Sequence, residues 1–220
     1  LSRTVPDELL AHIARRIPVV MIAGPRADDA YDHISTDSAG GMRAMTEHLI
    51  TSHGITDLAF IGGPADSPDA KNRFDGHREA LRSAGLRVAR APRMRGDFTR
   101  SQGRAIGREL LAEGRLPRAL VCANDQMALG VLDALTRAGV RVPEDAVVTG
   151  FDGIDATQLS SPRVTTVRQP MLELGRAAVD TLLRRLSDPQ LAPDSRTLPV
   201  EVLLRESCGC LPVASHDDFS

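Results

Sequence analysis

Short apolar or β-branched runs alternate along this chain with longer stretches in which apolar residues recur at helical spacing. Four runs are short enough to be buried strands, at residues 18–22, 58–61, 119–123 and 147–151, and a less regular one lies at 33–35. Strands that alternate with helices favour crossover connections and a parallel sheet. The pattern therefore predicts an α/β protein.

The stretches between these runs carry recognisable helix ends. Thr99 and Gln102 have the spacing of a capping box, and Asp125 stands where it can cap the next helix. Glycines follow most of the apolar periods, which is typical of helix ends in a left-handed conformation. The expected helices run from Asp37 or Ser38 to Gly54, over residues 72–84, from Thr99 to Gly114, from Asp125 to Gly139, and from Pro170 to Asp188.

The two halves of the pattern differ in completeness. Residues 56–166 supply a nearly complete series of strands and helices, whereas residues 1–52 supply one helix, one clear strand, the less regular strand and one further helix. The sequence therefore predicts two units of α/β structure, of which the first is incomplete.

Composition narrows the class of protein. The 220 residues are 42% hydrophobic with a formal net charge of −2, which suits a globular core and lacks the basic footprint of a nucleic-acid-binding domain. No apolar run approaches the length of a membrane span, and no signal-peptide pattern opens the chain. We expect a cytoplasmic protein that touches neither membrane nor DNA through these residues.

Cysteine and histidine usage predicts neither a disulfide framework nor a metal site. The three cysteines are Cys122, Cys208 and Cys210, and the Cys-x-Cys pair offers two soft ligands where a structural zinc site needs four. The six histidines show no pair four apart on a helix and no nearby cysteine at ligand spacing. We expect reduced thiols without a role, no metal and no cofactor.

Catalytic templates are absent. The chain has no Gly-x-Ser-x-Gly, His-Glu-x-x-His, Gly-x-x-x-x-Gly-Lys-Ser/Thr or strand-following Gly-x-Gly-x-x-Gly. Gly62-Gly63-Pro64 could be a phosphate cradle or a tight turn, and the proline favours the turn because it removes an amide donor. Asp152 and Asp155 could serve acid–base chemistry or accept hydrogen bonds from a hydroxylated ligand, and binding is favoured because no base or nucleophile stands beside them. We expect a protein that is not an enzyme.

Polar residues follow several of the predicted strands. Asn124 and Asp125 come after one strand, Asp152 follows another, and Arg73 lies in the first turn of the helix after residues 58–61. Each has an ordinary explanation as a cap, turn former or surface cation. The carboxyl ends of parallel strands, however, meet at one edge of a sheet, where open α/β sheets bind ligands. Together these residues predict a rim of donors and acceptors suited to a sugar or a nucleobase.

Five separated motifs resemble the effector domain of the LacI/GalR transcriptional regulators. The likeness covers about residues 5–208. Four shorter segments also fit the same family: residues 17–20, Asp37 with Gly41, residues 60–64 and residues 73–76. The motifs are Cys122-Ala-Asn-Asp-Gln-Met-Ala-Leu-Gly130, Ala138-Gly-Val-Arg-Val-Pro-Glu-Asp145, Thr149-Gly-Phe-Asp152, Ser161-Pro-Arg-Val-Thr-Thr-Val-Arg-Gln169 and Leu204-Arg-Glu-Ser207.

The resemblance implies a periplasmic-binding-protein-like fold, with two similar lobes joined by three crossing strands and the effector between them. By this analogy residues 1–56 form part of the first lobe, to which 168–188 return. Residues 57–167 form the second lobe together with 189–210, and 211–220 are a flexible tail.

The resemblance also assigns ligand-binding roles. Arg73 is similar to the arginine that grips a carboxylate or hydroxyls, and Phe98 to the aromatic residue that stacks on the ligand. The expected ligand-binding residues are Arg73, Phe98, Asn124, Asp152 and Gln169, with Asp69 and Lys71 as further candidates in a neighbouring loop.

Two short motifs depart from the family pattern. Gly153 stands where the family usually has a second aspartate after Asp152, and His53-Gly54 reverses the usual Gly-His. In the family, a helix-turn-helix, a hinge and the first strands of the first lobe precede the segment that matches Val5. We expect the DNA-reading part to lie outside these residues.

The resemblance implies the sensing and dimerisation part of a repressor that is controlled by a small molecule, most simply a sugar. Such a protein forms a homodimer and meets operator DNA only through the N-terminal domain. Two alternatives share the fold: a solute-binding protein that feeds a transporter, and a sensor fused to another signalling output.

Overall fold

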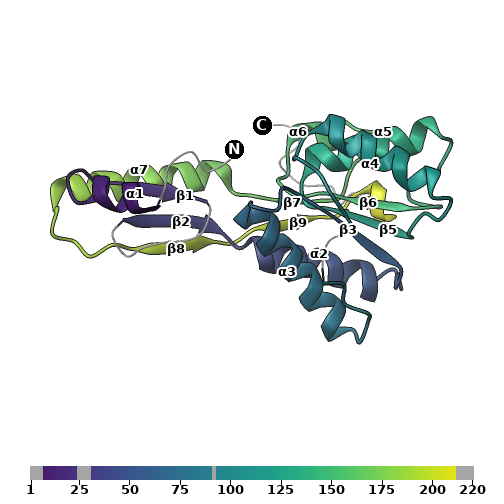
Figure 1. Ribbon diagram of the computed structural model, residues 1–220, viewed down its shortest axis with the longest axis horizontal. Helices are drawn as coiled ribbons and strands as arrows, with labels where there is room; N and C mark the ends of the chain where they lie inside the picture. Colours follow the sequence, from purple (N-terminus) through teal and green to yellow (C-terminus); the bar gives the residue numbers. More distant parts are fainter. Residues whose placement is uncertain (1–6, 24–30, 91–92, 212–220) are drawn as a thin grey trace. The chain divides into compact units, whose positions relative to one another are not determined.

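The computed structural model describes residues 7–23, 31–90 and 93–211 (Figure 1). The chain divides into two compact units. The first takes residues up to 37, 66–69 and 169–200, and the second takes 38–65, 70–168 and 201 onward. All but the first residue of the predicted tail 211–220 lies outside the described residues.

The first unit is a small parallel sheet. Its strands are β1 (Val20–Ile22), β2 (Asp32–Thr36) and β8 (Ser195–Leu198), in the order β1-β2-β8. Helix α7 (Met171–Ser187) packs on β1 and β2, and α1 (Asp7–Ala14) is the other helix described in this unit. Strand β2 confirms the less regular strand that was expected at residues 33–35.

A buried ion pair fastens α7 to this sheet. Arg185 on α7 pairs with the Asp32 carboxylate, which is 1% exposed and also accepts a 2.8 Å bond from the amide of Asp194. Arg185 further donates to the carbonyl of Leu191 at 2.8 Å. These bonds hold the segment that leads into β8 and lower the pKa of Asp32 against the opposing effect of its burial.

The outer face of α7 is apolar and open. Within the described residues β1 pairs only with β2, so one sheet edge is also open. Five large apolar side chains of the helix are more than half exposed: Met171, Leu172, Val179, Leu183 and Leu186.

The second unit is built on a parallel sheet of four strands in the order β4-β3-β5-β6. Helices α2 and α3 cover one face, and α4 and α5 cover the other (Figure 1). The strands are β3 (Leu58–Gly62), β4 (Met94–Arg95), β5 (Ala119–Cys122) and β6 (Val147–Thr149). The helices are α2 (Ser38–Thr51), α3 (Pro68–Ser83), α4 (Arg100–Ala112), α5 (Asp125–Arg137) and the short α6 (Asp155–Gln158).

The C-terminal part of the second unit adds an antiparallel pair. β7 (Thr166–Arg168) pairs with β9 (Glu201–Leu203), and bridges at Thr149–Thr165 and Asp152–Arg168 connect β7 to the end of β6. A 3-10 turn, η1 (Glu206–Cys208), follows β9.

Helices α4 and α5 cross at two glycines. A Cβ atom on Gly103 would lie 2.3 Å from the carbonyl oxygen of Met127, and one on Gly130 would lie 2.1 Å from that of Arg100. The backbones therefore approach more closely than side chains would allow. Arg100 and Arg104 on α4 both pair with Asp133 on α5, which fixes the crossing further.

The division into units differs from the predicted lobes in three places. Residues 66–69 were assigned to the second lobe but belong to the first unit. Helix α2 was assigned to the first lobe but packs in the second unit, where Thr46 bonds His77 of α3 and the backbone at Ala39 leaves no room for a Cβ on Gly76. Residues 189–200 were assigned to the second lobe but belong to the first unit, because β8 pairs with β2.

The predicted helix ends are mostly confirmed. Thr99 caps α4 by accepting a 3.2 Å bond from the amide of Gln102. The cap of α5 is Asn124 and not Asp125, because the Asn124 side chain accepts from the amide of Met127. Helix α3 begins at Pro68, earlier than expected. None of the described helices is long and apolar enough to cross a membrane.

A buried histidine links α2 to α3. The Thr46 hydroxyl donates to the carbonyl of Met42 at 2.9 Å, so it accepts from Nδ1 of His77, which lies 3.1 Å away. The His77 ring is 2% exposed beside the rings of Phe60 and Phe74. Burial lowers the pKa of His77 to about 4, so the ring is neutral at pH 7.

His77 should make the protein less stable in acid. Its pKa in the fold lies below its ordinary value of 6.5, so the unfolded chain binds the proton first and stability falls as the pH drops from 6.5 toward 4. From pH 7 to pH 5 this group should remove about 2 kcal/mol. The His77→Asn protein keeps a donor for Thr46 but does not titrate, so its urea-unfolding free energy should lose about 2 kcal/mol less over that range. An equal loss in both proteins would contradict the prediction.

Candidate functional site

The carboxyl ends of the four parallel strands of the second unit lie at one edge of its sheet. The residues that follow β5, β6 and β4 are Asn124, Asp152 and Phe98, and Arg73 reaches the same edge from α3. The structure therefore brings together four of the six predicted ligand-binding residues. The edge is the one at which open parallel sheets bind ligands.

Arg73 is the most firmly held of these residues. Its side chain is buried, and Nη1 donates to the carbonyl of Ala123 at 2.7 Å. Nη2 lies 3.1 Å from Oδ1 of Asp152, and Cζ stands 3.9 Å above the centre of the Phe151 ring. Its Nε has no hydrogen-bond partner among the described residues. Three contacts with the ends of β5 and β6 thus fix the direction of the guanidinium group.

Asp152 occupies a backbone conformation that is unusual for its type. Its φ is +122°, and its amide donates to the carbonyl of Val167 at 2.8 Å. The side chain is partly exposed while it pairs with Arg73. Residues held at positive φ without being glycine cluster at functional sites, where the surrounding structure supports the strain. The carboxylate is thus partly accessible to solvent.

Phe98 is positioned by the loop after β4. Its φ is +69°, and its ring lies over the residue that follows β3, where a Cβ on Gly63 would be 2.3 Å from two ring carbons. Gly63 therefore makes room for the ring. The turn that was expected at Gly62-Gly63-Pro64 lies further on, at Ala65 and Asp66, because Gly62 still belongs to β3. Nδ2 of Asn124 donates to the carbonyl of Phe98 at 3.0 Å.

Asn124 uses both ends of its amide inside the protein. Oδ1 caps α5 through Met127, and Nδ2 holds the loop at Phe98. Its first role in the structure is thus to hold the loop that carries Phe98 near the end of β5.

Asp125 has a role that the sequence did not predict. Its buried carboxylate accepts bonds from the amides of Gly153 at 2.7 Å and Ile154 at 2.9 Å, and from the hydroxyl of Thr166 at 2.6 Å. Burial raises the pKa of Asp125 to about 6 against these donors, so the group is ionised at pH 7. It ties α5 to the turn that carries Asp152.

The two remaining predicted ligand residues belong to the first unit. Oε1 of Gln169 accepts a 2.8 Å bond from the hydroxyl of Thr36, and Asp69 lies in the first turn of α3. Lys71, in the same turn, pairs with Asp75 at 2.7 Å and is exposed.

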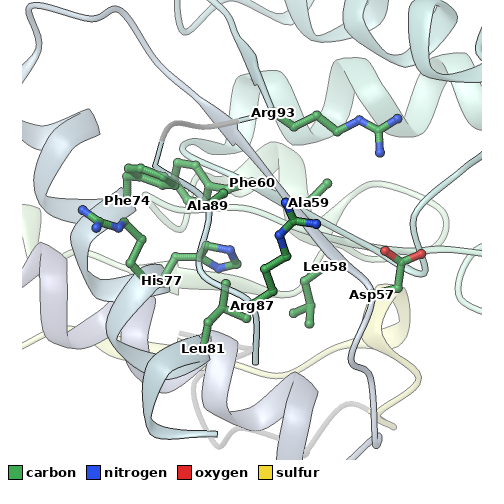
Figure 2. A pocket seen from close by; sticks show the side chains of 11 residues that line it. Asp57, Leu58, Ala59, Phe60, Phe74, His77, Leu81, Arg87, Ala89 and Arg93 are labelled. Atoms are coloured by element: carbon green, nitrogen blue, oxygen red, sulfur yellow. The ribbon is translucent and has the colours of Figure 1, made fainter. Parts of the chain in front are cut away.

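A shallow hollow of about 140 Å³ lies elsewhere in the second unit (Figure 2). Its lining includes Phe60, Phe74 and His77, with Arg87 and Arg93 at its rim. None of the predicted ligand residues lines it, and it is small beside the roughly 300–1,000 Å³ of ordinary ligand pockets. The strand-end residues are therefore the better candidate site.

The structure also joins four residues that the sequence had set aside. His48, His53, Cys208 and Cys210 have ligand atoms that all lie within 4.8 Å of one another. No cysteine stands at ligand spacing from a histidine along the sequence, but the fold brings together residues up to 162 positions apart.

Comparisons with known proteins agree with this architecture. Residues 46–208 match the periplasmic binding protein-like domain family. The ribose operon repressor of Escherichia coli K12 is 37% identical over 175 residues, which are 80% of this chain and 53% of that protein. The transcriptional repressor CytR of the same organism is 39% identical over 214 residues, 96% and 62% of the two chains. The chain thus spans a little over half the length of these relatives.

Solved structures give the same result. A LacI-family transcriptional regulator from Sanguibacter keddieii has a TM-score of 0.80 at 30% identity, over 88% of this chain and 72% of that one. A LacI-family regulator from Enterococcus faecium with bound ribose has a TM-score of 0.79 at 27% identity, over 94% and 75%. The relatives are transcriptional regulators, and no catalytic function is indicated. The chain belongs to the periplasmic-binding-protein-like effector domains of the LacI/GalR family of transcriptional regulators.

Proposed function

We propose that this chain is the effector-sensing part of a transcriptional repressor and that its ligand binds at Arg73, Asp152 and Phe98. The observation that carries the proposal is the fixed Arg73–Asp152 pair at the carboxyl edge of the second unit's sheet. The pair presents a donor and an acceptor side by side, and the Phe98 ring supplies an apolar face near them.

The charges of this pair favour a neutral, hydroxylated ligand. Asp152 already balances the charge of Arg73, so an anionic ligand would gain little from the guanidinium and would meet the carboxylate. Neighbouring hydroxyl groups can donate to a carboxylate and accept from a guanidinium at once. We therefore propose a sugar. The ribose named for two similar proteins is the first compound to test.

The proposed regulation follows from differential binding. A ligand that binds one conformation of the sensor more tightly than another shifts the equilibrium toward the first, and that shift changes operator affinity. The DNA-reading domain would be N-terminal to these residues. We further propose a homodimer in the cytoplasm, as the family resemblance implies.

The Asp152→Asn variant should separate ligand binding from folding. Asparagine has nearly the same size and shape as aspartate, so the turn should be kept while the charge is lost. The dissociation constant for the sugar, measured by calorimetry, should rise about 10- to 100-fold, the effect of losing a charge-assisted hydrogen bond.

Asp155→Asn is the matched control for this test. Asp155 is an exposed carboxylate three residues further on, at the start of α6, and its loss should leave the dissociation constant unchanged. Equal affinities in the two variants would contradict the assignment of Asp152.

Phe98→Ala should weaken the response to the ligand without weakening DNA binding itself. In the full-length protein, the ligand should change the affinity of the protein for the DNA segment that lies upstream of the protein's own gene. The variant should need at least about tenfold more ligand for the same change, because it lacks the stacking ring. Electrophoretic mobility shifts over a ligand series measure both quantities. A wild-type protein whose DNA affinity is the same with every sugar and nucleoside tested would refute the regulatory proposal.

A further inference from the structure

Two histidines and two cysteines of the second unit aim their ligand atoms at one point. His48 is in the last turn of α2, and His53 follows the end of that helix. Cys208 ends η1, and Cys210 follows after one glycine. The segments are far apart in the sequence, so only the fold brings them together.

Four of the six distances between the ligand atoms are close to those of a tetrahedral metal site, and all six are within 4.8 Å. Nε2 of His48 lies 3.1 Å from Nε2 of His53, and Sγ of Cys210 lies 3.4 Å from each of these nitrogens. Sγ of Cys208 lies 3.9 Å from Nε2 of His48. Tetrahedral zinc with ordinary bond lengths separates two nitrogens by about 3.3 Å, and a nitrogen from a sulfur by about 3.6 Å.

Hydrogen bonds alone do not account for the contacts at His48, although the Cys208 thiol also lies 3.2 Å from the carbonyl oxygen of Arg205. Nε2 of His48 is approached by His53 and by both sulfurs, whereas a ring nitrogen either donates one proton or accepts one. Both histidines also turn the same nitrogen toward the centre. A cation there would satisfy all four groups at once.

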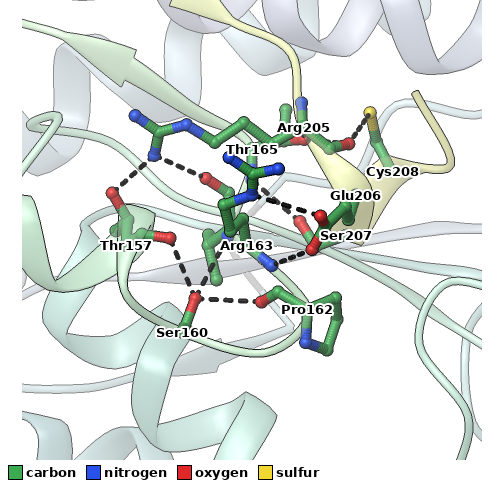
Figure 3. A network of polar contacts seen from close by, with 10 residues as sticks. Thr157, Ser160, Pro162, Arg163, Thr165, Arg205, Glu206, Ser207 and Cys208 are labelled. Atoms are coloured by element: carbon green, nitrogen blue, oxygen red, sulfur yellow. Dashed lines mark hydrogen bonds and ion pairs between the residues drawn. The ribbon is translucent and has the colours of Figure 1, made fainter. Parts of the chain in front are cut away.

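The segment that carries the cysteines is held in place by other bonds (Figure 3). Nη1 of Arg205 donates to the hydroxyl of Thr157 at 2.8 Å and to the carbonyl of Val164 at 3.1 Å. The hydroxyl of Ser207 donates to the carbonyl of Val148 at 2.5 Å and accepts from the amide of Thr165 at 2.8 Å.

Gly209 completes the turn between the two cysteines. Its φ is +95°, a conformation that favours glycine, and it lies beside the His53 ring. The ligands are therefore placed by the fold itself, which lowers the entropy lost when a metal binds.

We propose that His48, His53, Cys208 and Cys210 bind one zinc ion as a closed structural site. Two thiolates and two imidazoles are a ligand set that tetrahedral zinc accepts, and four protein ligands leave no open position for catalysis. The ion would connect the C-terminal segment to the end of α2.

This cluster lies at the amino ends of the strands of the second unit. The two histidines precede β3, and Gly209 lies near Pro143, which precedes β6. The proposed effector residues lie at the carboxyl ends of the strands or reach that edge. The zinc site is thus separate from the proposed effector site.

Metal content tests this proposal directly. Full-length protein purified under reducing conditions from zinc-supplemented cells should hold one zinc per chain after dialysis, measured by plasma mass spectrometry. Cys210→Ser and His53→Asn should each lose most of that zinc. Cys210 is only partly buried, so the serine variant should fold. Cys122→Ala and His12→Gln change a cysteine and a histidine outside the cluster and should keep the metal.

Two further measurements distinguish the site from an accidental one. Cobalt added to the metal-free protein should give the strong visible absorption of tetrahedral thiolate ligation, which Cys210→Ser should lack. A chelator should lower the melting temperature of the wild type by about 5–10 °C and leave that of Cys210→Ser unchanged. Wild-type protein that holds no more zinc than Cys210→Ser would overturn the proposal. So would a Cys208–Cys210 disulfide found by mass spectrometry under the same reducing conditions.

Discussion

The second unit depends on one buried carboxylate. Asp125 stands at the start of α5 and accepts two backbone amides from the turn after β6 and a hydroxyl from β7. Without these bonds the amides of Gly153 and Ile154 would be left without partners, and the turn would lose its shape. That turn holds Asp152 in its strained conformation, and Asp152 in turn meets Arg73. The candidate site is therefore supported by a residue that does not face it.

The first unit is held together differently. Its core is a small cluster around Ile34, Leu174 and Ala178, and the buried pair of Asp32 with Arg185 connects its helix to its sheet. Most of the other large apolar side chains of α7 are exposed. The second unit has a larger apolar core, in which β3, β5 and β6 are buried on both faces.

The sequence predicted the features that local patterns control. The expected strands, most helix ends and the positions of Asn124 and Asp152 after their strands were predicted correctly, because apolar period and capping residues are local signals. Strand β4 was not expected, and Arg73 lies in the second turn of α3 instead of the first, because the helix begins at Pro68. Phe98 was named only through the family resemblance. The sheet on which α2 packs was not predicted correctly, since an apolar stripe does not identify its partner. The roles of Asn124 and Asp125 were exchanged for a similar reason: either residue can cap a helix, and only the position of the turn at Gly153 decides between them. The His and Cys cluster escaped prediction because ligand spacing was sought along the chain, whereas His48 and Cys208 are 160 residues apart.

The conformation of Asp152 has a consequence for how this sensor can evolve. At φ +122°, well beyond the left-handed helical region, only glycine is free of strain, and aspartate is held there by the surrounding structure. Mutation at this point can remove or restore a negative charge, but it cannot readily introduce a bulky or branched side chain. New ligand specificities in descendants of this protein should therefore arise from substitutions around residue 152, while the hydrogen-bond acceptor at that position stays nearly constant. The backbone conformation limits the substitutions that selection can use there.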